Sequence, residues 1–241
     1  MIAPRVVAIV QARMGSARLP GKSLQPIAGR PLLAHVLLRA RTIVGVDAVV
    51  LATSVNDRDK PLTWVADDLG ILSVTGSEHD VLGRFADAAM RHRADVIMRI
   101  TGDCPLLAPD VCQRVLACYR SDPFVRYVSN DTTSTGYPDG TDCEVFSASV
   151  LREANLAAHD DGEREHVTPF MRTHCASREV LSDVGDWRHL KLSVDCQEDL
   201  EYVRRIFGFL PDGWTSTPSS MSLPVTLAAV ARCAKRVQAL P

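Results

Sequence analysis

The sequence predicts an α/β fold with a doubly wound, mostly parallel but mixed sheet and helices on both faces. In the first half of the chain, short apolar runs alternate with segments of helical periodicity, which is the pattern of βαβ units. In the later half this alternation is less strict, which favours a mixed sheet. The chain has 241 residues, 46% of them hydrophobic, so one domain spanning 1–241 can bury a full core.

Each expected element has a local reason. The run 6–10 is continuously apolar and β-compatible, as in a strand buried on both faces. Further strands are expected at 48–52, 71–74, 95–100, 125–128, 143–146 and 190–194. A helix is expected to open around Pro31, because proline suits a first helical turn and apolar residues then recur at helical spacing. Further helices are expected at 57–69, 81–90, 109–119, 147–158, 164–174, 198–207 and 225–240.

The loop after the first strand is the most informative stretch of the sequence. Two glycines, Gly15 and Gly21, let backbone N–H groups approach a ligand closely. Three cations, Arg13, Arg18 and Lys22, can neutralise phosphate oxygens. A polyphosphate is therefore the expected ligand of this loop. The alternative is an ordinary surface loop whose charges are solvated.

Two familiar phosphate-binding patterns are excluded by counting. The P-loop needs four residues between its first glycine and the Gly-Lys-Ser/Thr sequence, whereas Gly15 and Gly21 enclose five. The dinucleotide-binding fingerprint needs a Gly-x-Gly, which this loop lacks.

Two aspartates follow predicted strands and are candidates for a metal site. Asp103 comes soon after the strand 95–100, and Asp195 directly follows the strand 190–194. The carboxyl ends of parallel strands share one edge of a sheet, so both carboxylates are expected beside the first loop. Carboxylates beside a polyphosphate suit Mg²⁺. The alternatives are a turn residue for Asp103 and a helix N-cap for Asp195.

Several motifs together resemble those of the nucleotide-sugar cytidylyltransferases. They comprise Gln-Ala-Arg at 11–13, Arg-Leu-Pro-Gly-Lys at 18–22, Thr-Gly-Asp-Cys-Pro-Leu at 101–106 and the acidic segment 194–200. The match covers about 5–207 and is most similar to the branch of spore coat polysaccharide biosynthesis protein F. Acylneuraminate and 3-deoxy-manno-octulosonate cytidylyltransferases are its relatives. The remainder, 208–241, is expected to form a C-terminal loop and helix of unassigned role.

The resemblance implies roles for particular residues. The loop would wrap the triphosphate of CTP, and Arg13, Lys22 and Asp103 would be catalytic. The implied nucleotide-binding residues are Ala12, Arg13, Gly15, Ser16, Lys22, Ser77 and Arg84. Mg²⁺ would be held by Asp103 and Asp195. The implied acceptor-binding residues are Asn130, Asp142, Glu144 and His166, although a lone histidine is more often structural.

The reaction implied is attack by an acceptor oxygen on the α-phosphorus of CTP, with release of pyrophosphate. Such transfer depends on positioning and electrostatics, so no covalent nucleophile is needed. The acceptor is expected to be a small acid: a sugar acid, a phosphosugar, or a phosphorylated or phosphonate metabolite. The alternatives are a metal-dependent glycosyltransferase that uses a nucleotide sugar, and a non-catalytic nucleotide-binding protein.

Composition limits the remaining classes. The net charge of −2 gives no general basic surface for nucleic acid, and no apolar run reaches the length of a membrane span. Seven cysteines without a Cys-x-x-Cys motif indicate reduced, mostly buried thiols. A cytoplasmic protein without a signal sequence is expected, and the resemblance makes a homodimer possible.

Overall fold

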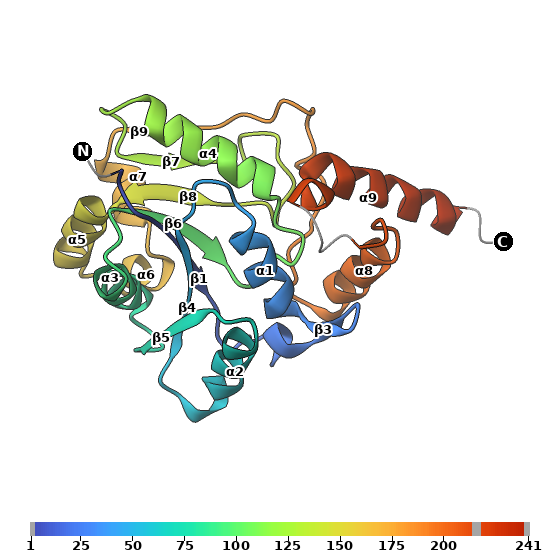
Figure 1. The fold of residues 1–241 in the computed structure, drawn as a ribbon, viewed down its shortest axis with the longest axis horizontal. Coiled ribbons are helices and arrows are strands. Elements are labelled where there is room, and N and C mark those ends of the chain that lie inside the picture. Colours follow the sequence, from blue (N-terminus) through green and yellow to red (C-terminus); the bar gives the residue numbers. More distant parts are fainter. Residues whose placement is uncertain (1–2, 214–217, 239–241) are drawn as a thin grey trace.

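The computed structural model describes residues 3–213 and 218–238, and within them seven strands form one mixed sheet (Figure 1). The strands lie in the order β5-β4-β1-β6-β8-β7-β9. Their bounds are β1 Val6–Gln11, β4 Ala48–Ser54, β5 Leu72–Gly76, β6 Val96–Thr101, β7 Tyr127–Ser129, β8 Glu144–Ser147 and β9 Ser177–Glu179. A small antiparallel pair, β2 (Pro26–Ile27) and β3 (Arg30–Pro31), lies outside this sheet. The expected fold class is confirmed.

The pairing changes direction at β8. The strands β5, β4, β1 and β6 are parallel, whereas β8 pairs antiparallel with both β6 and β7, and β9 runs parallel to β7. In the parallel half, Gln11 at the end of β1 pairs with Thr101 at the end of β6. The loops that follow these two strands therefore leave the sheet side by side.

Helices cover both faces of the sheet (Figure 1). One face carries α1 (Leu32–Arg41), α2 (Lys60–Asp68), α4 (Pro109–Ser121), α8 (Gln197–Phe207) and α9 (Leu223–Gln238). The other face carries α3 (Val81–Arg91), α5 (Ala148–Ala157), α6 (Asp161–His166) and α7 (Pro169–His174). Short 3₁₀ segments lie at Lys22–Leu24, Asp57–Asp59 and Pro218–Met221.

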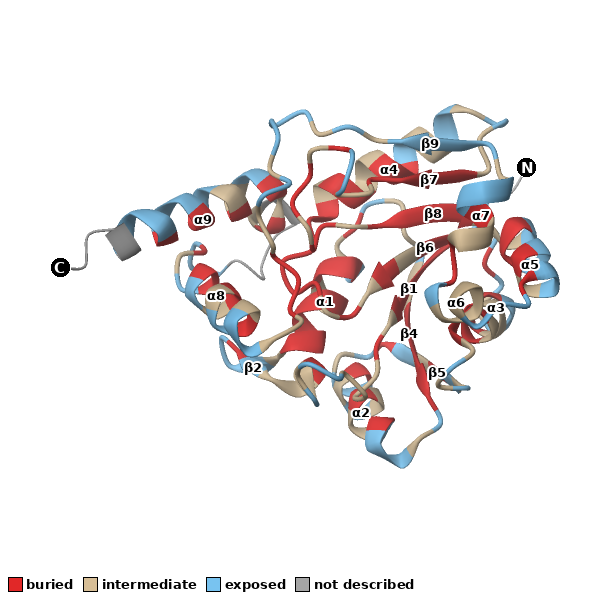
Figure 2. Ribbon diagram, turned by 180° about the vertical axis from the view of Figure 1, so that it is seen from behind, coloured by how far each residue is buried: buried red, intermediate tan, exposed pale blue. Residues whose placement is uncertain are grey.

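Strand β1 shows why its sequence is apolar throughout. Val6, Ala8 and Val10 belong to the core under one helical layer, while Val7 and Ile9 belong to the core under the other. Side chains of a strand alternate between the faces, so a sheet covered on both sides needs apolar residues at every position. Figure 2 shows these central strands buried, while the edge strand β9 is exposed.

The expected strand 190–194 is not part of the sheet. The segment is extended, but it forms only an isolated bridge between Lys191 and Asp139. The place beside β6 is taken by β8, and the segment instead donates from Val194 N to the carbonyl oxygen of Asp103. The prediction was wrong in detail, because an apolar run predicts extended backbone but not its partner.

Other boundaries also differ. The helix expected over 164–174 is two helices separated at Val167, which has φ of 70° and joins them through a tight turn. Strand β9 was not predicted, since its sequence Ser-Arg-Glu carries no apolar signal. The last helix begins at Leu223, and residues 239–240 of its expected range lie outside the described residues.

The segment after 207 is attached through a buried arginine. Arg39 of α1 donates from Nη1 to the carbonyl oxygens of Leu107 and Met221, both at 2.9 Å. Leu223 N donates to Asp110 Oδ1 at the start of α4. Burial lowers the pKa of Arg39 to about 9. The C-terminal helix is therefore held by polar contacts as well as by its apolar face.

We expect Gly140→Ala to destabilise the fold more than Gly29→Ala. Both glycines have positive φ, so either alanine costs about 1 kcal/mol of backbone strain. A Cβ at position 140 would also lie 2.5 Å from the backbone nitrogen of Ser193, whereas one at position 29 meets nothing within 4 Å. The difference in unfolding free energy, measured with urea, should be about 2 kcal/mol or more. Equal losses would show that the turn can move away from residue 193.

Candidate active site

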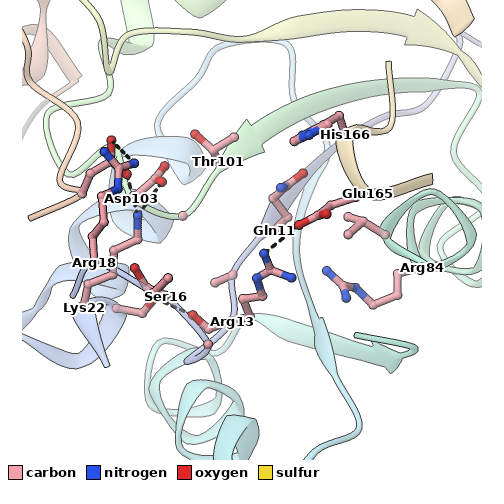
Figure 3. A pocket seen from close by; sticks show the side chains of 17 residues that line it. Gln11, Arg13, Ser16, Arg18, Lys22, Arg84, Thr101, Asp103, Glu165 and His166 are labelled. Carbon is pink, nitrogen blue, oxygen red and sulfur yellow. Dashed lines mark hydrogen bonds and ion pairs between the residues drawn. The ribbon is translucent and has the colours of Figure 1, made fainter. Parts of the chain in front are cut away.

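A cavity of about 460 Å³ lies at the carboxyl ends of β1 and β6 (Figure 3). Its floor comes from the strand ends and its walls from the 11–22 loop, α3 and α6. Open parallel sheets bind ligands at this edge. The lining residues are Gln11, Ala12, Arg13, Gly15, Ser16, Ala17, Arg18, Lys22, Ser23, Val81, Arg84, Thr101, Gly102, Asp103, Glu165, His166 and Asp195.

The shape of the 11–22 loop is set partly by residues in the connection between β4 and α2. Asp59, buried at the start of α2, accepts a hydrogen bond of 2.7 Å from Met14 N. Ser54 at the end of β4 donates to the other oxygen of Asp59. Gly21 N also bonds the carbonyl oxygen of Met14. Nothing in the sequence distinguished Asp59 from a surface aspartate, because only the fold buries it.

Lys22 joins three separate parts of the chain. Its Nζ donates to Asp103 Oδ2 at 2.8 Å, to the Val194 carbonyl oxygen at 2.8 Å and to Asp195 Oδ1 at 3.1 Å. Burial alone would lower the pKa of Lys22, but the two carboxylates outweigh it and raise the pKa. Lys22 therefore remains charged at neutral pH.

The oxygen atoms around Lys22 fit a hard divalent cation. The carboxylates of Asp103 and Asp195 already converge on one positive charge, although only Asp103 follows a sheet strand. No group of three or more His, Cys, Asp or Glu side chains within 3–213 and 218–238 is arranged for a metal ion. A cation here would thus take few protein oxygens, as Mg²⁺ does when phosphate and water supply the rest.

A second group of charges lies on the opposite side of the cavity. Arg13 pairs with Glu165 of α6 at 2.8 Å, and the heads of Arg13 and Arg84 point toward each other in Figure 3. Arg84 is buried and donates to the carbonyl oxygen of Ser77 at 2.6 Å. Burial and the charge of Arg13 lower the pKa of Arg84. Two adjacent guanidinium groups favour an anionic guest.

A second cavity, of about 320 Å³, adjoins the first. Both cavities are lined by Thr101, Asp103 and Asp195. Its other lining residues are Arg99, Cys104, Ser129, Asp131, Asp139, Asp142, Cys143, Glu144, Arg172 and Ser193. Molecules bound in the two cavities would therefore meet at the aspartates.

Glu144 lies at the back of this second cavity and is only 4% exposed. It accepts hydrogen bonds from Thr168 Oγ1 and Arg172 Nη2, both at 2.8 Å, and from Arg99 and the hydroxyl of Tyr127. Burial opposes ionisation, but the two guanidinium groups and the hydrogen bonds outweigh it and lower the pKa of Glu144 to about 2. Its oxygens are thus occupied by the protein itself.

The other sequence-predicted residues occupy different places. Asp142 lines the second cavity, where burial and the charge of Asp139 raise its pKa to about 6. His166 lines the first cavity, beside Glu165. Asn130 is buried and bridges Thr141 O and Cys143 N. Ser77 acts through its carbonyl oxygen on Arg84.

Some lining residues escaped sequence reasoning. Arg99 is a cation inside the apolar strand β6, two residues before its end, and that position was a usable signal. Gln11 and Thr101 end their strands, and their residue types alone do not mark them as site residues.

The cysteines are all free thiols. Burial raises the pKa of Cys104 well above its ordinary value, and the negative charge of Asp103 raises it further. A thiolate nucleophile is not favoured there.

A doubly wound sheet with a cationic loop and paired carboxylates at its edge defines a nucleotide-binding α/β protein. The cytidylyltransferase family model matches residues 7–207. The chain belongs to the cytidylyltransferase family and is an enzyme of that class.

Named relatives and solved structures agree with this assignment. The chain is 31% identical to the spore coat polysaccharide biosynthesis protein SpsF of Bacillus subtilis over 84% of its own length and 86% of that protein. It is 38% identical to a 3-deoxy-manno-octulosonate cytidylyltransferase of Anaeromyxobacter over 46% of each chain. Its fold is similar to a cytidylyltransferase from Leptospira borgpetersenii, with a TM-score of 0.89, 24% identity and 99% coverage of both chains.

A further structural neighbour carries a nucleotide. It is a CMP:2-keto-3-deoxy-manno-octonic acid synthetase in complex with CTP, with a TM-score of 0.64 and 20% identity. The match covers 85% of this chain and 98% of that one. In the described part of this chain, no helix is both long and apolar enough to cross a membrane.

We expect Glu144→Gln to lower the unfolding free energy by about 3 kcal/mol near neutral pH, since two guanidinium groups lose a buried counter-charge. The pKa of Glu144 is lower in the folded state than its ordinary 4.5, so its contribution is complete above that value and is lost as pH falls toward about 2. The difference between wild type and variant should therefore shrink below pH 4.5 in urea titrations. Glu179→Gln, at an exposed carboxylate, is the control and should change stability by less than about 0.5 kcal/mol. A difference that stays constant into acid would refute this account.

Proposed function

We propose that this enzyme transfers CMP from CTP to an oxygen of a small acidic acceptor, with Mg²⁺, and releases pyrophosphate. The observation that carries the proposal is the meeting of two cavities at Asp103 and Asp195. One cavity is lined by cations suited to a triphosphate, and the other has room for a small acceptor. Their shared residues lie where the reacting atoms would come together.

The choice of CTP rests on the family and on named relatives. The family model is that of cytidylyltransferases, and one structural neighbour holds CTP. Ala12 and Gly15 line the cavity with little side chain, so the backbone there can approach a nucleotide closely. We assign nucleotide binding to this loop and to Ser16, with Ser77 holding Arg84 in place.

The triphosphate would lie between the two groups of cations. Arg13 and Arg84 approach from one side of the cavity and Lys22 from the other (Figure 3). Lys22 offsets negative charge that develops on the phosphoryl oxygens, and Arg13 orients the phosphates. Mg²⁺ at Asp103 and Asp195, when bound, adds positive charge to the same oxygens. No side chain needs to bond covalently to the substrate.

The acceptor would occupy the second cavity with its nucleophilic oxygen toward Thr101 and Asp103. Asp142 would contact it directly, whereas Glu144 and Asn130 would shape the wall by holding neighbouring groups. His166 is within the nucleotide cavity and would contact the acceptor only near the α-phosphorus. A homodimer, which the resemblance makes possible, is part of the same proposal and is measurable by light scattering.

Pyrophosphate release tests the proposed reaction. The assay combines Mg²⁺, each of the four nucleoside triphosphates, and a panel of acidic sugars, phosphosugars and small phosphonates. We expect release with CTP and one class of acceptor, and a fall of about 100-fold or more in Asp103→Asn, which loses a charged cation ligand. Asp183→Asn, at an exposed surface pair with Arg114, should retain wild-type activity. If none of the four triphosphates gives pyrophosphate release and a sugar nucleotide protects the enzyme against thermal unfolding, the results would instead support a glycosyltransferase.

Lys22→Met tests the electrostatic role of the lysine. We expect kcat at saturating CTP to fall by about 100-fold or more, because the developing charge on phosphorus oxygens loses its nearest cation. Lys60→Met removes an exposed lysine that pairs with Asp57 and should leave kcat unchanged. If the variant keeps a normal kcat and only its KM for CTP rises, Lys22 contributes to binding of CTP and not specifically to the transition state.

A further inference from the structure

One wall of the first cavity is formed by a helix that buries none of its own residues. Helix α6 has six residues, Asp-Gly-Glu-Arg-Glu-His, and all of them are polar or glycine. The helix nevertheless places Glu165 and His166 in the lining of the cavity. A helix this short is not stable by itself in water. Its position therefore depends on polar contacts and on the residues that flank it.

Arg164 supplies the polar contacts. Its Nε and Nη2 donate to the two carboxylate oxygens of Asp80 at 2.9 and 2.8 Å. Its Nη1 donates to the carbonyl oxygens of Asn155 and Ala158, at the end of α5, at 3.3 and 3.1 Å, and Nη2 also donates to Asn155 Oδ1 at 3.0 Å. A planar guanidinium can make all these hydrogen bonds at once, whereas a lysine ammonium cannot reproduce the two-pronged pair.

Asp80 belongs to a neighbouring wall of the same cavity. It is the N-cap of α3, which lies beside α6 in Figures 1 and 2, and its Oδ1 accepts from Gly83 N at 2.8 Å. The first turn of α3 then carries Val81 and Arg84, which both line the cavity. Burial alone would raise the pKa of Asp80, but the hydrogen bonds from Arg164 and Gly83 N outweigh it and lower the pKa. A charged pair thus joins α6 to the start of α3 at neutral pH.

The other end of α6 is fixed by the residue that follows it. Val167 is fully buried, and its backbone has φ of 70°. This conformation is costly for a β-branched residue and is kept only where the surrounding structure imposes it. Glu165 and His166 therefore lie between two fixed points, the ion pair of Arg164 and the buried side chain of Val167.

The position of α6 matters to the cations of the cavity. Arg13 Nη2 donates to Glu165 Oε1 at 2.8 Å. Figure 3 shows the heads of Arg13 and Arg84 pointing toward each other, and burial together with the charge of Arg13 lowers the pKa of Arg84. Two adjacent guanidinium groups repel each other, and the carboxylate of Glu165 offsets this repulsion. Glu165 thus keeps Arg13 turned into the cavity before a phosphate group arrives.

We infer that Arg164 is a positioning residue of the nucleotide site, which holds α6 against α3 through its pair with Asp80. In this way it places Glu165, and Glu165 orients Arg13. The inference rests on the proposed function, since it assigns the first cavity to CTP. Arg164 is not among the residues that line this cavity, so it acts through its neighbours and not by touching the nucleotide.

Calorimetric titration with CTP and Mg²⁺ tests the inference. We expect Kd to rise by about 10-fold or more in Arg164→Gln, because a displaced α6 no longer holds Arg13 in its binding position. Arg164→Lys keeps the charge but loses the two-pronged pair, and should still bind CTP at least about 3-fold more weakly than the wild type. Arg91→Lys is the matched control, since Arg91 lies on α3 and pairs with Asp87 at the surface, and it should bind CTP as the wild type does.

A double-mutant cycle tests whether the two partners act as one unit. Asp80→Asn removes the charge but leaves a residue that caps a helix well. The double variant Asp80→Asn/Arg164→Gln should bind CTP within about 2-fold of the weaker single variant, because either change breaks the same pair. Effects that multiply would show two independent roles and would overturn the inference.

Amide hydrogen exchange separates positioning from a general loss of stability. Exchange in 161–167, followed by mass spectrometry, should be faster in Arg164→Gln, while the urea midpoint of unfolding stays close to that of the wild type, because α6 buries no residue of its own. Unchanged exchange in this segment, or loss of the fold in both Arg164 variants, would contradict a local role.

The titrations also separate this inference from the proposed function. Wild-type affinity for CTP in Arg164→Gln overturns the inference and leaves cytidylyl transfer standing. If CTP binds but no acceptor gives pyrophosphate release, the proposed reaction fails and the Kd values still decide the role of Arg164. A wild-type chain that binds no CTP refutes both.

Discussion

The contact of Lys22 with Asp103 and Asp195 is the interaction on which the site depends. The two aspartates lie 81 and 173 residues after the lysine in the sequence. One ammonium group lies between two carboxylates that would otherwise repel each other, and the carbonyl oxygen of Val194 completes its coordination. This side-chain contact adds to the backbone hydrogen bonds that join the same segments, from Val194 N to Asp103 O and from Gly102 N to Gln11 O.

The rest of the site is arranged around that convergence as two compartments of different charge. In the first cavity, Arg13 and Arg84 lie close together, and Glu165 pairs with Arg13 (Figure 3). In the second cavity, carboxylates predominate. Under the proposed function, this difference in charge would favour a polyanion in the first cavity over the second.

Buried polar residues whose side chains are bound within the protein itself also control this arrangement. Asn130 fixes the strand that follows the 131–142 loop, and Asp59 fixes the first loop from the side of α2. Glu144 orients two arginines and the hydroxyl of Thr168 at the junction of α6 and α7. The resemblance implied acceptor binding for Asn130 and Glu144, and the structure shows that polar atoms of both side chains are bound within the protein.

The sequence by itself determined the layers of the fold, because apolar periodicity is a local property, and its cation-glycine spacing predicted a polyphosphate ligand for the first loop. It also identified Asp103, which follows a predicted central strand. Only the tertiary structure decided how Asp195 reaches the site, since the segment 190–194 bonds a loop instead of joining the sheet. The burial of Asp59 and the pairing of Arg164 with Asp80 were likewise decided there, because counter-charges and solvent access depend on residues far away in the chain.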